Sequence, residues 1–316
     1  MKLLSWFILL ISSVTYALDM TPNNTREIHD LMYLPESGTV FTEITFTSTH
    51  SDSDIEYVNQ NLTSESKKML ETELQIGSSI NDRFAWAIEV PYTLKEESET
   101  EYGPASTQNG QKEIIENQGL QDINLKLKYR LKEQSTDKVN LDISLNVSPK
   151  TGDSEKGSTT KDGNAYRGGT DFGIGLEVGK KFKDFSLVGN VSFEHNGESE
   201  SKLLSDESTT KVDSYNTLVL GVTAQLMPTE NLFLNAGVGI VNIGEYESLN
   251  DGTKTKYDYD SSLVFAFGLG YIISKDSAFG IDYSFISVER DISQDSMNFE
   301  EEADASIVNA RWNLQF

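Results

Sequence analysis

The feature that most constrains this chain is a period-two alternation of apolar residues, repeated in segments of about ten residues. Residues 263–273 carry Leu, Phe, Phe, Leu, Tyr and Ile at every second position, and residues 123–131 alternate Ile, Leu and Tyr with Asn, Lys and Arg. Successive side chains of a strand point to opposite faces, so this pattern predicts strands with one apolar face. About ten residues is also the length with which a tilted strand crosses a bilayer.

Twelve such segments follow one another along the chain. They cover about 38–48, 66–80, 83–94, 119–132, 137–149, 168–180, 184–196, 214–227, 231–244, 260–274, 277–289 and 303–316. The connections between them alternate between long and short, and the long ones are rich in polar residues. An even number of strands with short turns at one end and long loops at the other is typical of outer-membrane barrels. We therefore predict an all-β fold, a 12-stranded antiparallel transmembrane β-barrel in the cell outer membrane.

A soluble all-β protein with one buried face is the alternative. It is disfavoured because the apolar parity continues through all twelve segments and the long loops fall on one side. In hydrocarbon every backbone N–H and C=O must be paired, so a spanning sheet has to close into a barrel.

The N-terminus carries a targeting segment. Met1 and Lys2 precede the apolar run 3–14, and small residues precede a cleavage point after Ala17. This pattern predicts a secretory signal peptide at 1–17. Residues 18–37 lack clear periodicity, and the sequence leaves open whether they form a periplasmic tail or a small plug. The barrel itself is expected over 38–316.

Composition excludes several classes of protein. The 316 residues include 26 Lys and Arg against 50 Asp and Glu, a formal net charge of −24, and they include no Cys. A surface this acidic repels a phosphate backbone, so nucleic acid is not an expected partner. The absence of Cys excludes thiolate metal sites and iron–sulfur clusters, and no cofactor is expected.

The last strand carries a further signal. Trp312, Leu314 and the terminal Phe316 share one parity. A terminal aromatic residue that closes an alternating strand resembles the signal read by the bacterial barrel-assembly machinery. That machinery and the outer-membrane lipids are the expected partners, together with a small-molecule solute.

The inward parity of the strands is predicted to be strongly polar. The charged residues expected to line the lumen are Glu71, Glu73, Glu89, Lys126, Lys128, Arg130 and Asp142. If Leu131 faces Val139 across their hairpin, Lys128 faces Asp142 and Arg130 faces Asn140. The basic row then forms either a charged constriction that orients solutes or a cross-strand ion-pair network.

Several inward positions are glycines, and these either leave room for a passage or aid strand curvature. The set comprises Gly173, Gly175, Gly221, Gly237, Gly239, Gly268 and Gly270.

The long loops carry most of the negative charge. Acidic runs follow the third segment (Glu96–Glu101) and precede the last one (Glu300–Asp304). An acidic pore mouth concentrates cations, so an open pore should prefer cations at low salt. No loop has the spacing of an ordered calcium site, and no metal site is predicted.

An enzyme is the least favoured class. Only His195 among the three histidines lies on a predicted strand, and Gly197 stands where a lipid hydrolase of the outer membrane would place its serine. A nucleophile needs a base within hydrogen-bond reach, and no serine is placed for that role.

Several short motifs occur in an order that resembles a known family. They are Pro91-Tyr92, then Gly119-Leu120-Gln121-Asp122, then Lys128-Tyr129-Arg130, and finally Pro149-Lys150-Thr151-Gly152-Asp153. The chain resembles the outer-membrane transporter family of the phenol-degradation meta pathway over about residues 84–195. Gln121 replaces a usual Gly, and Lys150 is inserted before Thr151. The resemblance implies passage of small molecules, hydrophobic or aromatic ones among them.

The predicted function is an outer-membrane channel for passive passage of small solutes. The alternative is a closed barrel that acts as a surface scaffold or adhesin through its acidic extracellular loops.

Overall fold

The computed structural model describes residues 28–58, 60–158, 161–182, 185–204, 208–294 and 297–316. The predicted signal peptide and residues 18–27 lie outside the described residues. The strand segments are β1 (Val40–Tyr57), β2 (Gln60–Asn81), β3 (Phe84–Tyr102), β4 (Lys112–Leu120), β5 (Asn124–Lys132), β6 (Asn140–Ser148), β7 (Ser154–Lys156), β8 (Gly169–Lys181), β9 (Phe185–Leu203), β10 (Thr209–Val212), β11 (Tyr215–Thr229), β12 (Leu232–Ile243), β13 (Tyr246–Asn250), β14 (Thr253–Tyr259), β15 (Ser262–Ser274), β16 (Ser277–Gln294) and β17 (Met297–Gln315). A short helix, α2 (Gln134–Asp137), joins β5 to β6.

All seventeen segments belong to one sheet. Four barrel strands are each made of two consecutive segments, namely β4 with β5, β10 with β11, β12 with β13 and β14 with β15, and β7 is a short extra segment parallel to β9. The result is a 12-stranded antiparallel barrel, as predicted. It closes where β1 pairs with β17, over sixteen residue pairs from Phe41 with Gln315 to Glu56 with Glu300.

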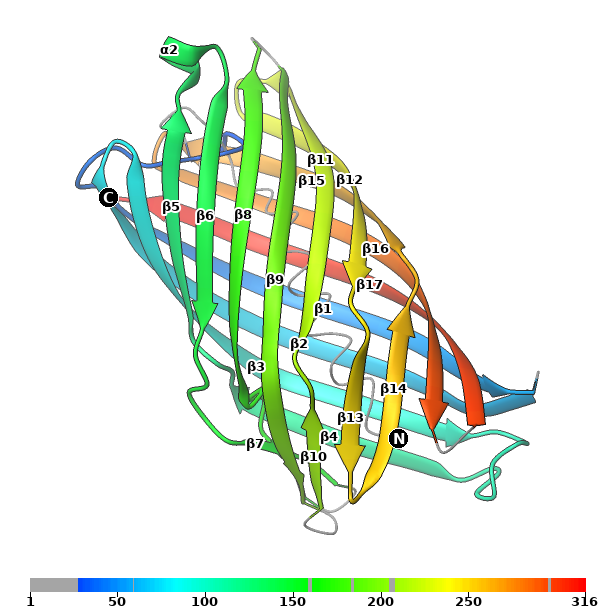
Figure 1. Ribbon diagram of the computed structural model, residues 1–316. Coiled ribbons are helices and arrows are strands. Elements are labelled where there is room, and N and C mark those ends of the chain that lie inside the picture. Colours follow the sequence, from blue (N-terminus) through cyan, green and yellow to red (C-terminus); the bar gives the residue numbers. More distant parts are fainter. Residues whose placement is uncertain (1–27, 59, 159–160, 183–184, 205–207, 295–296) are drawn as a thin grey trace.

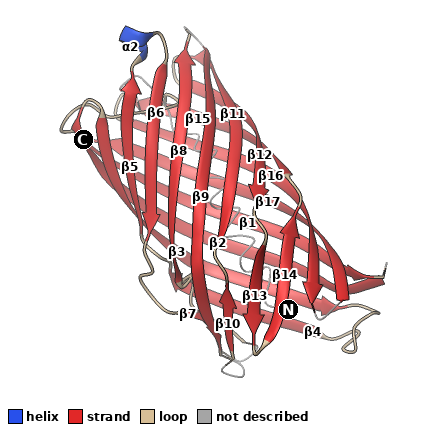
Figure 2. Cartoon of the chain, viewed as in Figure 1, coloured by secondary structure: helices blue, strands red, loops and turns tan. Residues whose placement is uncertain are grey.

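The two ends of the barrel differ. The short turns, α2 and the C-terminus lie at one end, and the β1–β2 and β16–β17 hairpins extend toward the other (Figure 1). Figure 2 shows that almost the whole wall is strand and that α2 stands at the short-turn end. No helix among the described residues is long and apolar enough to cross a membrane.

The outward face carries the lipid-facing residues that the alternation predicts. Leu263, Phe265, Phe267 and Leu269 of β15 are 43–58 % exposed, while the residues between them point into the barrel. Hydrocarbon is the solvent for these exposed apolar side chains, and the closed sheet pairs the backbone groups that lipid leaves unsatisfied.

The strands are longer than predicted at the outer end. Most residues expected in long loops, such as 49–57 and 290–294, continue the strands as hairpins beyond the lipid-facing band. The lipid-facing alternation ends at the membrane boundary, whereas backbone pairing continues into water. The pattern therefore marked the spanning part of each strand and missed its extension.

The residues predicted as an assembly signal lie at the closing seam. Trp312 faces outward and donates a hydrogen bond from its indole to the Ser277 hydroxyl, at 3.0 Å. Phe316 is 77 % exposed, and its backbone N–H bonds to the Val40 carbonyl at 2.8 Å. Leu314, between them, is paired with Thr42 of β1. Recognition of these residues by the assembly machinery stays a prediction.

Candidate functional site

A cavity of about 290 Å³ lies in the lumen next to β2, β3, β5, β6, β8 and β9. Five of the seven predicted lining residues border it, namely Glu71, Glu73, Glu89, Lys126 and Lys128. The other two, Arg130 and Asp142, face the lumen closer to the short-turn end and are both 1 % exposed. Period-two alternation therefore placed all seven on the inner wall, while a role in a solute path stays a proposal.

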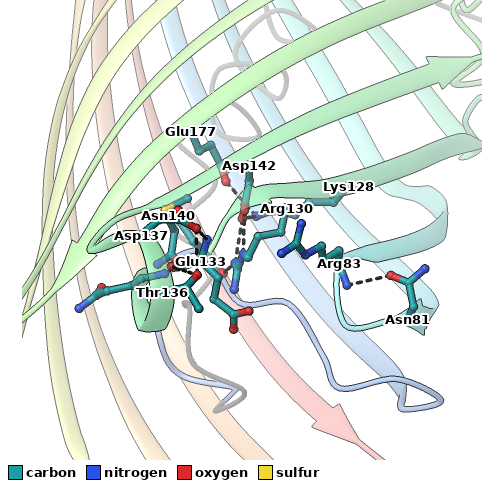
Figure 3. A network of polar contacts seen from close by, with 12 residues as sticks. Asn81, Arg83, Lys128, Arg130, Glu133, Thr136, Asp137, Asn140, Asp142 and Glu177 are labelled. Atoms are coloured by element: carbon teal, nitrogen blue, oxygen red, sulfur yellow. Dashed lines mark hydrogen bonds and ion pairs between the residues drawn. The ribbon is translucent and has the colours of Figure 1, made fainter.

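The basic row of β5 takes part in a network of ion pairs with neighbouring strands. Lys126 pairs with Glu89 of β3, and the Lys128 ammonium lies 2.8 Å from Glu177 of β8 and 3.5 Å from Asp142 of β6. Arg130 binds Asp142 with two parallel bonds, from Nε at 2.8 Å and from Nη2 at 2.9 Å (Figure 3). Bidentate geometry of this kind is strong and directional.

The predicted register of this hairpin is wrong. The structure pairs Arg130 with Asp142 and Lys128 with Ser144, one inward position away from the prediction. The cause is the connection, because α2 and the left-handed Lys138 (φ 69°) occupy residues expected to form a tight turn and the first residues of a strand. Of the two interpretations left open, the structure shows the ion-pair network.

The described part of the N-terminal segment lies inside the barrel at the short-turn end. Arg130 donates a hydrogen bond to the Met32 carbonyl at 2.5 Å, and the Gln225 amide donates one to the His29 carbonyl at 2.9 Å. The Lys181 ammonium pairs with Asp30 at 2.5 Å. Since these partners come from β5, β8 and β11, the segment is held from several sides of the wall.

Apolar contacts add to these polar ones. Leu31, Met32 and Leu34 are at most 2 % exposed, and Ile28 packs with Phe233 of β12 and neighbouring side chains. Burying one such side chain contributes roughly 1.5–3 kcal/mol. Residues 28–34 thus narrow the lumen on the short-turn side of the cavity. The sequence had left open whether this segment is a periplasmic tail or a plug, because it lacks periodicity.

The inner wall is not polar throughout. On the outer half of β10–β17 the inward residues form an apolar cluster. It comprises Val212, Tyr215, Val219, Val241, Ile243, Tyr246, Tyr257, Val264, Ala266, Ile286, Val288, Ile292, Ala303, Ala305 and Ile307. We call this the apolar sector. The prediction of a strongly polar inward parity is wrong here, and the unbroken apolar run 263–267 was the signal that pointed to it.

Tyrosines form the outer end of the apolar sector. Tyr215 stacks on Tyr246 with ring centroids 4.7 Å apart, and Tyr246 contacts Tyr257 at 4.9 Å and Tyr259 at 5.9 Å. The Arg290 guanidinium lies 5.2 Å from the Tyr257 ring and pairs with Glu301. A cation over an aromatic face is stabilised by the ring quadrupole, so this buried charge has both a carboxylate and rings as neighbours.

Two of the inward glycines, Gly270 and Gly173, face space that neighbouring side chains occupy, whereas Gly175 borders the cavity. A Cβ on Gly270 would overlap the Phe233 ring, and one on Gly173 would overlap the Asn146 amide. Phe233 therefore fills the space that the missing side chain creates, and Asn146 does the same at Gly173.

Two of the family-like motifs meet at the outer edge of the cavity. Asp122 accepts hydrogen bonds from the Thr151 backbone at 2.7 Å, the Thr151 hydroxyl at 2.8 Å and the Arg167 backbone at 2.9 Å. Arg167 in turn pairs with Asp171 of β8 at 2.5 Å. The Asp of the first motif thus fixes the loop that carries the second, a contact that the order of motifs in the sequence did not reveal.

Two further kinds of site were considered, a catalytic His195 and a metal site. His195 faces outward, with Nδ1 2.9 Å from the Asn216 amide oxygen and its ring 4.9 Å from that of Phe172. Within the described ranges, no group of three or more His, Asp or Glu side chains is arranged to hold a metal ion.

A closed antiparallel barrel with a lipid-facing outer surface and a partly charged lumen defines an outer-membrane β-barrel protein. A family model described as "Putative MetA-pathway of phenol degradation" matches residues 59–295. The chain belongs to this family, as its motifs indicated, and is located in the outer membrane.

Solved structures support the same fold. An outer membrane channel from Pseudomonas putida F1 superposes with a TM-score of 0.56 at 14 % identity, over 90 % of this chain and 97 % of that one. The transport unit of the autotransporter AIDA-I from Escherichia coli superposes with a TM-score of 0.51 at 11 % identity, over 93 % and 97 %. No curated protein matches the chain in sequence.

Proposed function

We propose that this protein is an outer-membrane channel for passive passage of small solutes, including hydrophobic or aromatic ones. The observation that carries the proposal is the cavity of about 290 Å³ inside a barrel whose lumen has a charged side and an apolar side. The phenol-degradation family to which the chain belongs and its likeness to the Pseudomonas outer membrane channel support the same function.

A channel in this barrel has to pass residues 28–34 at the short-turn end. Contacts with Arg130, Lys181 and Gln225 hold these residues inside the barrel, where they narrow the lumen. Small solutes should therefore pass slowly through the intact protein. Removal of residues 18–34 should widen the path without removing any barrel strand.

Planar-bilayer conductance with a salt gradient tests the proposal. The intact protein should give small, discrete openings with cation preference at low salt, because acidic residues exceed basic ones. The variant lacking residues 18–34 should give larger openings. Absence of openings in both proteins, together with no uptake of small aromatic solutes by protein-containing vesicles, would overturn the channel.

One observation favours the scaffold alternative. On the outward face of the outer hairpins, Asp54 stands opposite Glu302, which in turn stands opposite Glu289. Like charges directly across a sheet are destabilising, and a cationic partner on the cell surface would relieve that repulsion. Deletion of the outer β16–β17 hairpin should abolish such binding and leave conductance intact if the scaffold function is correct.

A further inference from the structure

A single row of inward residues connects the N-terminal segment with the cavity. The registers of β11, β12, β15, β16, β17 and β1 place in line Gln225, Asn235, Gly268, Asp282, Asn309 and Thr47. We call these six residues the polar row. Gln225 donates its hydrogen bond to the His29 carbonyl at one end, and Thr47 borders the cavity at the other. Because the strands of a barrel are tilted, such a row moves along the barrel as it goes round the wall.

The polar row passes between two groups of apolar side chains. On β12, Asn235 lies between Phe233, which belongs to the cluster around Ile28, and Val241 of the apolar sector. The same order holds on β16, where Ala278 and Ile286 stand on the two sides of the row. The row therefore carries hydrogen-bonding groups through a part of the wall that has apolar clusters on both sides.

Asn235 differs from its neighbours in the polar row. The Thr47 hydroxyl donates a hydrogen bond to the Asn309 amide oxygen at 2.8 Å, and the Asp282 carboxylate pairs with Arg311. Neither the Nδ2 nor the Oδ1 atom of Asn235 has a hydrogen-bond partner in the described part of the chain, although the side chain is only 5 % exposed. A buried amide without partners is costly, because its desolvation is not compensated.

A solute with a primary amide group would satisfy both ends of Asn235 at once, since it offers an acceptor and a donor side by side. Gly268, the next position in the row, places no side chain beside the Asn235 amide. Hydrogen-bonding groups that line a pore set which solutes pass. We propose that the polar row is the path of solutes through the lumen and that Asn235 binds neutral primary amides on this path. The inference rests on the proposed function, because it takes the lumen to conduct solutes.

Introduced thiols test the path. The chain contains no Cys, so a single Cys variant reports on one position. With a trimethylammonium-ethyl methanethiosulfonate reagent and the full-length protein in lipid vesicles, Asn235→Cys should react at least about tenfold faster than Val241→Cys, because thiol reactivity follows access. Both residues face inward on β12 and are at most 5 % exposed, so static burial does not explain such a difference. Equal rates, or a faster reaction at position 241, would overturn the path.

A second pair of variants repeats this test on another strand. Asn309 belongs to the polar row on β17, and Ile307 on the same strand belongs to the apolar sector. Asn309→Cys should react at least about tenfold faster than Ile307→Cys. This pair decides the question if Asn235→Cys fails to fold.

Calorimetric binding to the protein in detergent micelles tests the ligand class. The two probes are benzamide, a primary amide, and N,N-dimethylbenzamide, which has the same ring and carbonyl but no N–H. Asn235→Leu should raise the Kd of benzamide at least about fivefold, because hydrogen bonds are lost, and leave that of the dimethyl compound unchanged. The control, Asn242→Leu, lies on the outward face of the same strand and should change neither value. An unchanged Kd of benzamide in Asn235→Leu, or equal weakening by both variants, would overturn the amide site.

The intact protein gives an independent measurement. Benzamide should bind it at least about fivefold more tightly than N,N-dimethylbenzamide, since only benzamide can donate a hydrogen bond to the Asn235 oxygen. Equal binding of the two probes would overturn the amide site even if Asn235→Leu fails to fold.

Conductance measured on the same preparations separates this inference from the proposed function. Openings with no faster reaction at positions 235 and 309 would overturn the polar row as the path and keep the channel. Binding of benzamide that depends on Asn235, without openings or solute uptake, would keep the amide site and overturn the channel.

Discussion

The two halves of the inner wall are built from different chemistry. The inward face of β2–β8 carries charged side chains that pair across neighbouring strands, as Lys126 does with Glu89 and Arg130 with Asp142. The outer half of β10–β17 carries Val, Ile, Ala and Tyr that pack against one another. One barrel thus combines a wall held by ion pairs with a wall held by apolar contacts.

The difference shows how a barrel of intermediate width fills its interior. Eight strands enclose only side chains and sixteen or more leave a broad channel, so twelve strands leave space that has to be partly filled. Apolar residues fill it by packing. Charged residues instead keep a cavity beside them, because each needs a partner or water.

Removal of Arg130 should produce the largest effect on the charged wall. Arg130→Met leaves Asp142, 1 % exposed, without its bidentate partner and removes the donor to Met32. Breaking a buried pair in this way costs about 3–5 kcal/mol of unfolding free energy, measurable by urea titration of the protein in lipid vesicles. Lys128→Met is the control. Lys128 is 20 % exposed, so its substitution should cost clearly less unfolding free energy. Equal losses would show that burial does not set the strength of these pairs.

A second change tests the outer end of the charged wall. Glu96 of β3 pairs with Lys67 of β2 at 2.5 Å, beyond the lipid-facing residues of both strands. Burial alone would raise the pKa of Glu96, but Lys67 and Lys156 outweigh burial and hold the pKa below its ordinary value of 4.5. Glu96→Gln should therefore cost about 1.5–3 kcal/mol at neutral pH, the range for hydrogen bonds to charged groups.

The sign of this effect gives a pH test. A carboxyl group with a lowered pKa in the folded state stabilises the fold above pH 4.5 and loses that contribution as the pH falls through its folded pKa. The difference in unfolding free energy between the wild type and Glu96→Gln should shrink between about pH 7 and about pH 3. A difference that grows on acidification would contradict a lowered pKa of Glu96 in the folded state.

The stability of the apolar wall should depend on side-chain volume and not on charge. Ile286 of β16 is 3 % exposed in the apolar sector, so Ile286→Val should cost about 0.5–1.5 kcal/mol. Ile281→Val on the same strand faces lipid at 46 % exposure and should cost less, because lipid fills the lost volume. The pair of unfolding curves distinguishes packing inside the barrel from contact with lipid.

The smallest effect is expected on the outward face. Glu302 lies between Asp54 and Glu289 on adjacent strands, so Glu302→Gln should stabilise the barrel by about 0.2–1 kcal/mol at low salt. The gain should fade at high salt. Glu97→Gln, which removes one of the two carboxylate partners of Lys95, should give no gain. A salt-independent gain would mean that repulsion is not its cause.

The fold follows from the sequence pattern because the membrane imposes it. Outward residues such as Phe265 and Phe267 had to be apolar at every second position, and a sheet in hydrocarbon has no alternative to closure. The same alternation predicted Glu71 and Lys128 on the inner face. It could not identify the apolar sector fully, since Val264 and Ile286 face inward with the same chemistry as residues that face lipid.

Taken by itself, the sequence determined the number of barrel strands, the residues that face lipid and the end of the barrel that carries the short turns. Only the tertiary structure decided that Arg130 meets Asp142, that residues 28–34 lie inside the lumen and that Asp122 binds the loop at Thr151. The physical reason is the range of the forces involved. Alternation within one strand reflects the two environments of its faces, lipid on one side and the lumen on the other. Register and contacts across the lumen depend instead on turn geometry and on side chains far apart in the chain.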